Sequence, residues 1–132
     1  MSVPCTAVVV VTHGQAGADM LDAAQAFLHV PLPLTVAVGI NPDDDSLMVN
    51  SKIDRAIGDL GVAGREDVLF LVDLIGSTPA RLCCDKCGDK GHVVTGVNMP
   101  MLLKLATTDR SVGPAELGSA LVLTGTKSIH VE

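Results

Sequence analysis

A histidine, an aspartate and an asparagine each follow a short aliphatic run in this sequence, at His13, Asp73 and Asn98. In a parallel sheet the carboxyl ends of the strands meet at one edge, where binding sites form. We therefore expect these three side chains to share one edge of a sheet. A carboxylate beside a histidine accepts a hydrogen bond from one ring nitrogen and fixes the tautomer. The other ring nitrogen is then free to act as a nucleophile or a base.

A turn of the type that precedes a helix follows Asp73, with the sequence Gly76-Ser77-Thr78-Pro79. Proline is favoured in the first helical turn and threonine is a good N-cap, so we expect Thr78 to cap a helix that begins near Pro79. The free N–H groups and dipole of such a helix start favour an anion. Phosphoryl transfer needs chiefly positioning and charge stabilisation, which these parts can supply.

Each of these residues also has a plainer interpretation. His13 is equally consistent with an ordinary loop residue, and Asp73 with a cap of a turn or helix. Ser77 and Thr78 are more often caps than ligands. Their combination at one predicted edge favours a functional site.

Aliphatic runs alternate with helical patterns along the chain. Strands are predicted at residues 8–11, 34–40, 67–72 and 92–97, and helices at 16–30, from the turn at 41–43 to 60, from 79, at 101–106 and at 114–124. This alternation is typical of an α/β fold with an open, mostly parallel sheet and helices on both faces. We expect one domain over residues 1–132.

A short final strand is predicted at residues 128–131, after a helix stop at Gly125. Ile129 and Val131 alternate with polar residues, as in a half-buried strand. So short a segment has little to bury alone, so we expect an antiparallel edge strand that either folds back or is exchanged between two subunits of a homodimer.

Composition excludes several classes of protein. The net charge of -6, the lack of Trp and Tyr, and the absence of a Lys/Arg block argue against binding of nucleic acid. No apolar run approaches the length of a membrane span, and the first residues lack a signal-peptide pattern. No glycine-rich dinucleotide or Walker-type motif is present. We expect a cytoplasmic protein without a cofactor.

Three cysteines lie close together at Cys83, Cys84 and Cys87, with His92 nearby. Such crowding is a poor disulfide framework and indicates a reducing compartment. The second half of a four-ligand zinc site is missing, so we expect no metal here. The acidic run at residues 43–45 is interpreted as a solvated helix start.

The order and spacing of four motifs resemble the enzyme IIA domain of the mannose family of bacterial phosphotransferase systems. These motifs are VVVTHG at residues 9–14, VLFLVD at 68–73, GSTP at 76–79 and GVNMPM at 96–101. The resemblance implies that His13 is phosphorylated through Nε2 and that Asp73 holds Nδ1. It also implies that Gly14, Ser77 and Thr78 bind the phosphoryl group, with Gly76 and Asn98 at the site edge or in contact with a partner.

The resemblance further implies two protein partners and a homodimer. The donor would be the histidine-containing phosphocarrier protein, the acceptor an enzyme IIB, and the last strand would be exchanged between subunits. The chain departs from the family pattern at Ala80-Arg81, where Phe-Asn is usual.

Three other functions are open at this point. One is the phosphotransferase subunit of dihydroxyacetone kinase, whose first domain is similar and also uses a histidine after the first strand. Another is a regulatory module that reports phosphorylation state without transport. The third is a response-regulator receiver with Asp73 as acceptor, although that fold normally has an acidic pair where Thr12-His13 stands.

Overall fold

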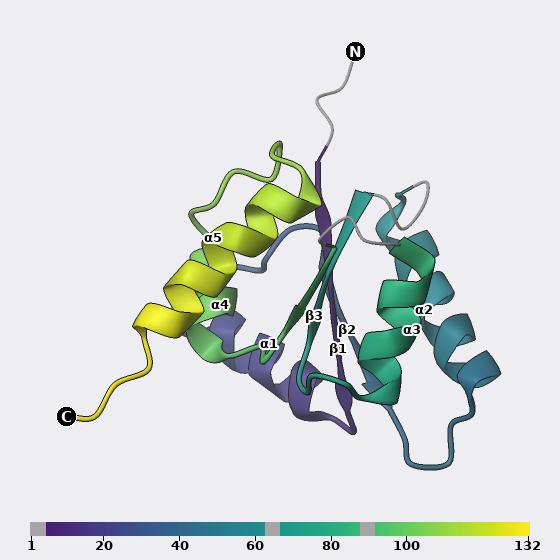
Figure 1. The fold of residues 1–132 in the computed structure, drawn as a ribbon. Helices are drawn as coiled ribbons and strands as arrows, with labels where there is room; N and C mark the ends of the chain where they lie inside the picture. The colour runs from purple at the N-terminus through teal and green to yellow at the C-terminus, as the bar shows by residue number, and fades with distance from the viewer. Residues whose placement is uncertain (1–4, 63–66, 88–91) are drawn as a thin grey trace.

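Strands and helices alternate along the described residues up to β4, after which two helices follow in succession (Figure 1). The structure is a computed structural model that describes residues 5–62, 67–87 and 92–132, and only the backbone of 84–87. The elements are β1 (Ala7–His13), α1 (Ala16–Leu28), β2 (Thr35–Ile40), α2 (Ser46–Leu60), β3 (Val68–Val72), α3 (Thr78–Cys87), β4 (Val93–Thr95), α4 (Met99–Lys104) and α5 (Pro114–Lys127).

The strands form one sheet in the order β2-β1-β3-β4, and every pairing is parallel. β1 lies in the middle, with Val11 opposite Val38 of β2 and Val72 of β3. Its run of valines suits a strand buried on both faces. The prediction of an open parallel α/β sheet is confirmed.

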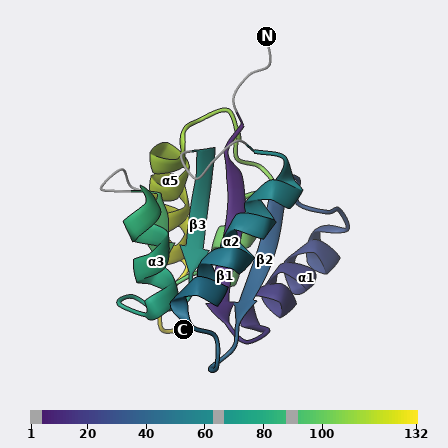
Figure 2. The same ribbon diagram turned by 90° about the vertical axis from the view of Figure 1, so that its right-hand side faces the viewer.

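Helices cover both faces of the sheet (Figures 1 and 2). α2 and α3 lie on one face, where Phe70 and Ile53 are buried in the core. α1, α4 and α5 lie on the other, around Leu71 and Leu121. Successive strand residues feed opposite cores because strand side chains alternate between faces.

Several helix ends differ from the sequence prediction. α1 ends at Leu28, with His29 in the left-handed conformation, and Phe27 is 72% exposed rather than part of the apolar stripe. α2 begins only at Ser46, because Asp45 caps it by accepting the N–H of Met48. α4 begins at Met99, two residues early, and β4 is shorter than predicted.

The largest correction concerns the end of the chain. Gly125 does not stop α5 but lies buried inside it. A Cβ there would lie 2.6 Å from Cε of Met101 and 3.1 Å from Nδ2 of Asn98, so glycine allows α5 to pack closely on α4. Residues 129–132 then follow α5 without joining the sheet of the same chain. Exchange of this segment between subunits stays a prediction.

Within the described residues, no helix is long and apolar enough to cross a membrane. No group of three or more His, Cys, Asp or Glu side chains in that part of the chain is placed to hold a metal ion. Cys83 is a buried core residue. The side chains of Cys84 and Cys87 lie outside the described residues, so the predicted absence of zinc binding stays a prediction.

Candidate functional site

The strand order places His13 and Asp73 at the switch point of the sheet. From β1 the chain crosses to β2 on one side, whereas β3 pairs with β1 on the other side. In open α/β sheets the crevice for a ligand lies at the carboxyl ends of the strands where the order reverses. His13 is the last residue of β1, and Asp73 directly follows β3.

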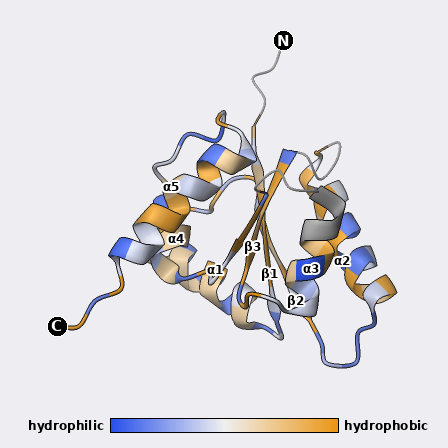
Figure 3. Cartoon of the chain, in the orientation of Figure 1, coloured by the Kyte–Doolittle hydropathy of each residue, from blue (hydrophilic) through white to orange (hydrophobic). Residues whose placement is uncertain are grey.

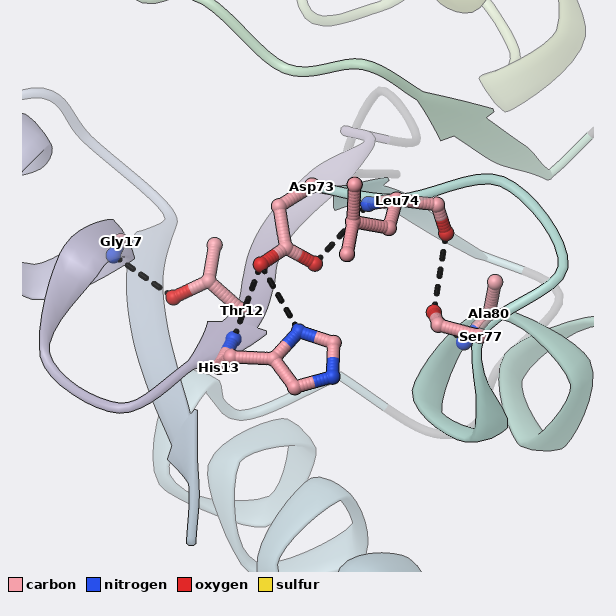
Figure 4. A network of polar contacts seen from close by, with 7 residues as sticks. All are labelled: Thr12, His13, Gly17, Asp73, Leu74, Ser77 and Ala80. Carbon is pink, nitrogen blue, oxygen red and sulfur yellow. Dashed lines mark hydrogen bonds and ion pairs between the residues drawn. The ribbon is translucent and has the colours of Figure 1, made fainter. Parts of the chain in front are cut away.

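The Asp73 carboxylate contacts His13 twice (Figure 4). Its Oδ2 accepts the His13 backbone N–H at 3.0 Å and lies 3.0 Å from Nδ1 of the ring. Its Oδ1 accepts the N–H of Leu74 at 2.9 Å. The contact to Nδ1 leaves Nε2 facing away from the carboxylate, and the His13 side chain is 52% exposed. The arrangement presents one ring nitrogen to a partner molecule.

Burial raises the pKa of the Asp73 carboxyl, but the hydrogen bonds from His13 and Leu74 outweigh it. The net effect holds the pKa of Asp73 below its ordinary value. Asp73 is therefore a carboxylate at neutral pH and accepts, rather than donates, at Nδ1.

The loop after His13 is fixed by its neighbours. The buried Thr12 Oγ1 accepts the Gly17 N–H at 2.6 Å, which satisfies a donor at the start of α1. Gly14 has φ of +57° and donates its N–H to the Ile40 carbonyl at 2.8 Å. These contacts tie the loop to both α1 and β2.

The turn between Asp73 and α3 is built by Ser77. Its hydroxyl donates to the Leu74 carbonyl at 2.8 Å and accepts the Ala80 N–H at 3.3 Å. Gly76 adopts φ of +72°, a conformation that favours glycine. Ser77 rather than Thr78 therefore caps α3, and Thr78 is the exposed first residue of that helix.

A family model described as the PTS system fructose IIA component, EIIA-man, matches residues 7–119. The chain belongs to this family. It is a IIA component of the mannose family of the phosphotransferase system, and so a phosphotransferase component.

Solved structures of similar proteins share the fold of this IIA component. The mannose/sorbose specific IIA subunit from Enterococcus faecalis is 22% identical, with a TM-score of 0.82 over 97% of this chain and 95% of that one. A PTS IIA protein associated with the fucose utilization operon from Streptococcus pneumoniae is also 22% identical, with a TM-score of 0.77, over 99% and 96%. The component EIIA from Streptococcus agalactiae is 20% identical with a TM-score of 0.77, over 96% of each chain. No curated protein matches the chain.

Asn98 has a structural part in this IIA component. Its Oδ1 accepts the Met101 N–H at 3.2 Å, which caps α4, and its Nδ2 donates to the Gly125 carbonyl at 3.4 Å. It thus connects the start of α4 with α5 near the carboxyl end of β4. A part in partner contact stays a prediction.

Two residues that hold the site were missed by sequence reasoning. Thr12 was seen only as the neighbour of His13, although a hydroxyl shortly before a predicted helix, here four residues before Ala16, can bond a free N–H of its first turn. Gly39 lies against the loop of His13, and a Cβ there would be 2.5 Å from the Gly14 carbonyl oxygen. A glycine inside an aliphatic strand is a signal of such close backbone approach.

Proposed function

We propose that this IIA component carries a phosphoryl group on Nε2 of His13. The histidine-containing phosphocarrier protein would supply the group, and an enzyme IIB would receive it. The observation that carries the proposal is the 3.0 Å contact of Asp73 Oδ2 with Nδ1 of a half-exposed His13. A carboxylate on one nitrogen directs the nucleophilic lone pair to the other.

His13 keeps its Nδ1 proton when it accepts the phosphoryl group, so the step needs no proton acceptor. With the proton on Nδ1, the Nε2 lone pair attacks phosphorus as the bond from phosphorus to the donor's nitrogen breaks. The phosphorylated ring is then a cation, which the Asp73 carboxylate stabilises. The start of α3, with Thr78 exposed, offers dipole and donors to the phosphoryl oxygens.

Phosphorylation with phosphoenolpyruvate, enzyme I and the phosphocarrier tests this function. Acid-labile label should map to His13, and His13→Ala should abolish it. His29→Ala, which removes an exposed histidine at the end of α1, is the matched control and should be labelled normally. Label that remains on His29, His92 or His130 in His13→Ala would refute the assignment.

The onward step is tested with the labelled protein and a cognate enzyme IIB. Loss of label from His13 with its appearance on the acceptor supports a relay. Stable label on His13 in the presence of that acceptor would favour a regulatory sensor.

We further propose a homodimer in which the C-terminal segment of each subunit lies on the other. β4 is an edge strand of the sheet, and its outer edge pairs with no strand in the part of the chain that the structure describes. A groove of about 500 Å³ lies between β4 and α5, and its lining is Val93, Val94, Gly118, Ser119, Val122, Leu123 and Thr126. The hydrophobic stretch of α5 that borders it is visible in Figure 3. Ile129 and Val131 are exposed in the single chain and have the apolar character that this groove accepts.

A further inference from the structure

A hydrogen bond holds the backbone on each side of His13. Before the ring, Asp73 Oδ2 accepts the His13 N–H at 3.0 Å. After it, Gly14 donates its N–H to the Ile40 carbonyl at 2.8 Å. The second of these bonds depends on the orientation of the peptide between Ile40 and Asn41, at the end of β2. Whatever fixes this peptide therefore also fixes the loop after His13.

Asp44 holds that peptide by its other end. Its Oδ2 accepts the Asn41 N–H at 2.9 Å, and its own N–H donates to the Asn41 carbonyl at 3.0 Å. The Ile40 carbonyl and the Asn41 N–H belong to one planar unit, so a bond to the second orients the first. Hydrogen bonds in a chain also polarise one another. The Asp44 carboxylate thus both orients the carbonyl that receives the Gly14 N–H and makes it a stronger acceptor.

Lys52 of α2 holds the Asp44 carboxylate in place. Its Nζ donates to Asp44 Oδ2 at 2.6 Å and to the Gly39 carbonyl at 3.1 Å. The Asp44 side chain is only 12% exposed. The hydrogen bonds from Lys52 and from the Asn41 N–H hold the pKa of Asp44 below its ordinary value, so this group is a carboxylate at neutral pH. One ion pair therefore bonds the peptide groups on both sides of Ile40.

The acidic run at residues 43–45 divides into three roles. Asp43 is exposed to solvent, as the sequence analysis expected of the whole run. Asp45 caps α2 by accepting the Met48 N–H. Asp44 instead reaches back to the end of β2, where one peptide unit separates its carboxylate from the Gly14 N–H. Its place in the structure thus connects it with the site rather than with the helix start.

We propose that Asp44 is a positioning residue for phosphoryl transfer, which acts on the loop of His13 through the peptide between Ile40 and Asn41. The inference rests on the proposed function, because the placement of Nε2 affects transfer only when that atom receives the phosphoryl group. Transfer requires the attacking and leaving atoms to be nearly in line, so a small shift of the loop slows the step. Such a shift does not weaken the attraction between the two proteins.

Phosphorylation of His13 by the phosphorylated carrier measures this role. Asp44→Ala should lower kcat about tenfold and change the KM for the carrier less than about twofold. Asp44→Asn should fall between this variant and the unmodified protein, because an amide oxygen can still accept the Asn41 N–H. The matched control is Asp43→Ala, a change at the exposed neighbouring residue, which should keep both constants. Phosphoramidate, a small chemical donor that needs no docking, should give the same order of rates.

The amide resonance of Gly14 provides a readout that lower stability alone would not change. In Asp44→Ala the Gly14 proton signal should move upfield, because its hydrogen bond is weaker, and its exchange with solvent should quicken. The reference is the amide of Gly61, which donates to the Gly58 carbonyl and should not respond. Thermal unfolding sets a temperature at which each variant is folded, and Asp44→Asn carries the same comparison as the milder change.

The outcomes separate the positioning role from the proposed function. An unchanged kcat in both Asp44 variants, an unchanged Gly14 signal, or an equal loss of rate in Asp43→Ala would overturn the role given to Asp44. Absence of label on His13 of the unmodified protein with either donor would instead refute the proposed function.

Discussion

Asp73 holds His13 through two atoms of the same residue, the backbone nitrogen and the ring nitrogen Nδ1. The two contacts fix the position of the His13 backbone and the orientation of its ring. The amide oxygen of an asparagine could also accept the backbone N–H, whereas a carboxylate is the better acceptor at Nδ1 and stabilises a ring cation. A neutral replacement is therefore expected to separate the positional from the electrostatic contribution.

Asp73→Asn should fold but transfer phosphoryl groups slowly. A hydrogen bond to a charged group contributes about 1.5–3 kcal/mol, which corresponds to a rate about tenfold to a hundredfold lower. Single-turnover transfer to and from His13 measures this, with thermal unfolding as the check on folding. Asp109→Asn is the control, because the Asp109 carboxylate accepts hydrogen bonds from the backbone N–H and hydroxyl of Ser111 in its own loop. Unchanged transfer in both directions would contradict the role given to Asp73.

The pair of Asp44 and Lys52 should make stability sensitive to acid. The hydrogen bond from Lys52, at 2.6 Å, holds the pKa of Asp44 below its ordinary value of 3.8, and the pKa of Asp73 is lowered as well. Below about pH 5 the unfolded chain binds more protons than the folded one, so the free energy of unfolding falls with pH. The stability that the ionised Asp44 and Asp73 contribute is fully present above the pKa of the unfolded state and is lost as pH falls through the pKa of the folded state.

Urea unfolding between pH 7 and pH 3 measures that loss. Asp44→Asn should be less stable at pH 7 and should show a shallower fall toward acid. Asp43→Asn, a change at the exposed neighbouring residue, should keep the slope of the unmodified protein. An unaltered slope in Asp44→Asn would show that this pair does not govern acid stability.

At the residue scale, sequence reasoning placed His13 and Asp73 at one edge because each follows an aliphatic run. Their contact was implied only by the resemblance, because it depends on β1 and β3 being neighbours, which no local pattern encodes. The sequence predicted Thr78 as the cap of α3, whereas Ser77 caps it in the structure. Adjacent hydroxyls are nearly equal caps, and the choice between them depends on the turn at Gly76.

At the scale of elements, the loop after β1 is shaped by a glycine in β2. Gly39 has no Cβ to collide with the Gly14 carbonyl, and Lys52 donates to the Gly39 carbonyl at 3.1 Å. The same lysine bonds Asp44, so the end of β2 is tied to α2. β2, which supports the loop after His13, is thus bonded to α2 through Lys52.

Gly39→Ala should destabilise the protein by about 1–3 kcal/mol, because the new Cβ meets backbone rather than a flexible side chain. It should also slow phosphorylation of His13, since the Gly14 loop has to shift. Gly58→Ala is the control, because Gly58 lies inside α2 and a Cβ added there would meet open space. This variant should raise the free energy of unfolding by about 0.5–1 kcal/mol. Chemical unfolding and labelling rates measure both effects. Equal stability of the two variants would show that the Gly39 contact relaxes without cost.

The elements themselves were predicted well where periodicity was strong and less well at their ends. The strands of the sheet coincide with the aliphatic runs, although β4 pairs over only three residues. The end of α5 was misplaced because glycine usually stops a helix, whereas Gly125 is retained for contact with Met101. Such packing against a distant helix overrides local propensity.

At the scale of the whole molecule, β4 is one of the two edge strands of the sheet, and no strand among the described residues pairs with its outer edge. The segment after α5 contains Ile129 and Val131, whose apolar side chains are exposed. Open edges invite pairing with another chain, and exchange of identical segments under twofold symmetry covers two edges at once. α5 delivers the segment at the same end of the sheet as the site, because it runs from Pro114 toward the carboxyl edge near Asn98.

Deletion of residues 129–132 should therefore convert a homodimer into a monomer of lower stability. The cut leaves α5 intact, since the helix ends at Lys127 and Ser128 still donates its N–H to the Thr124 carbonyl. Val122→Asp, which places a charge in the groove beside β4, should have the same effect with the full segment present. Phe27→Asp, an equally polar change far from this groove, should remain dimeric.

Sedimentation equilibrium measures the assembly, and the melting temperature of the dimer should rise with protein concentration whereas that of the truncated form should not. An intact protein that is monomeric at micromolar concentration, or a truncated one that is still dimeric, would refute this arrangement.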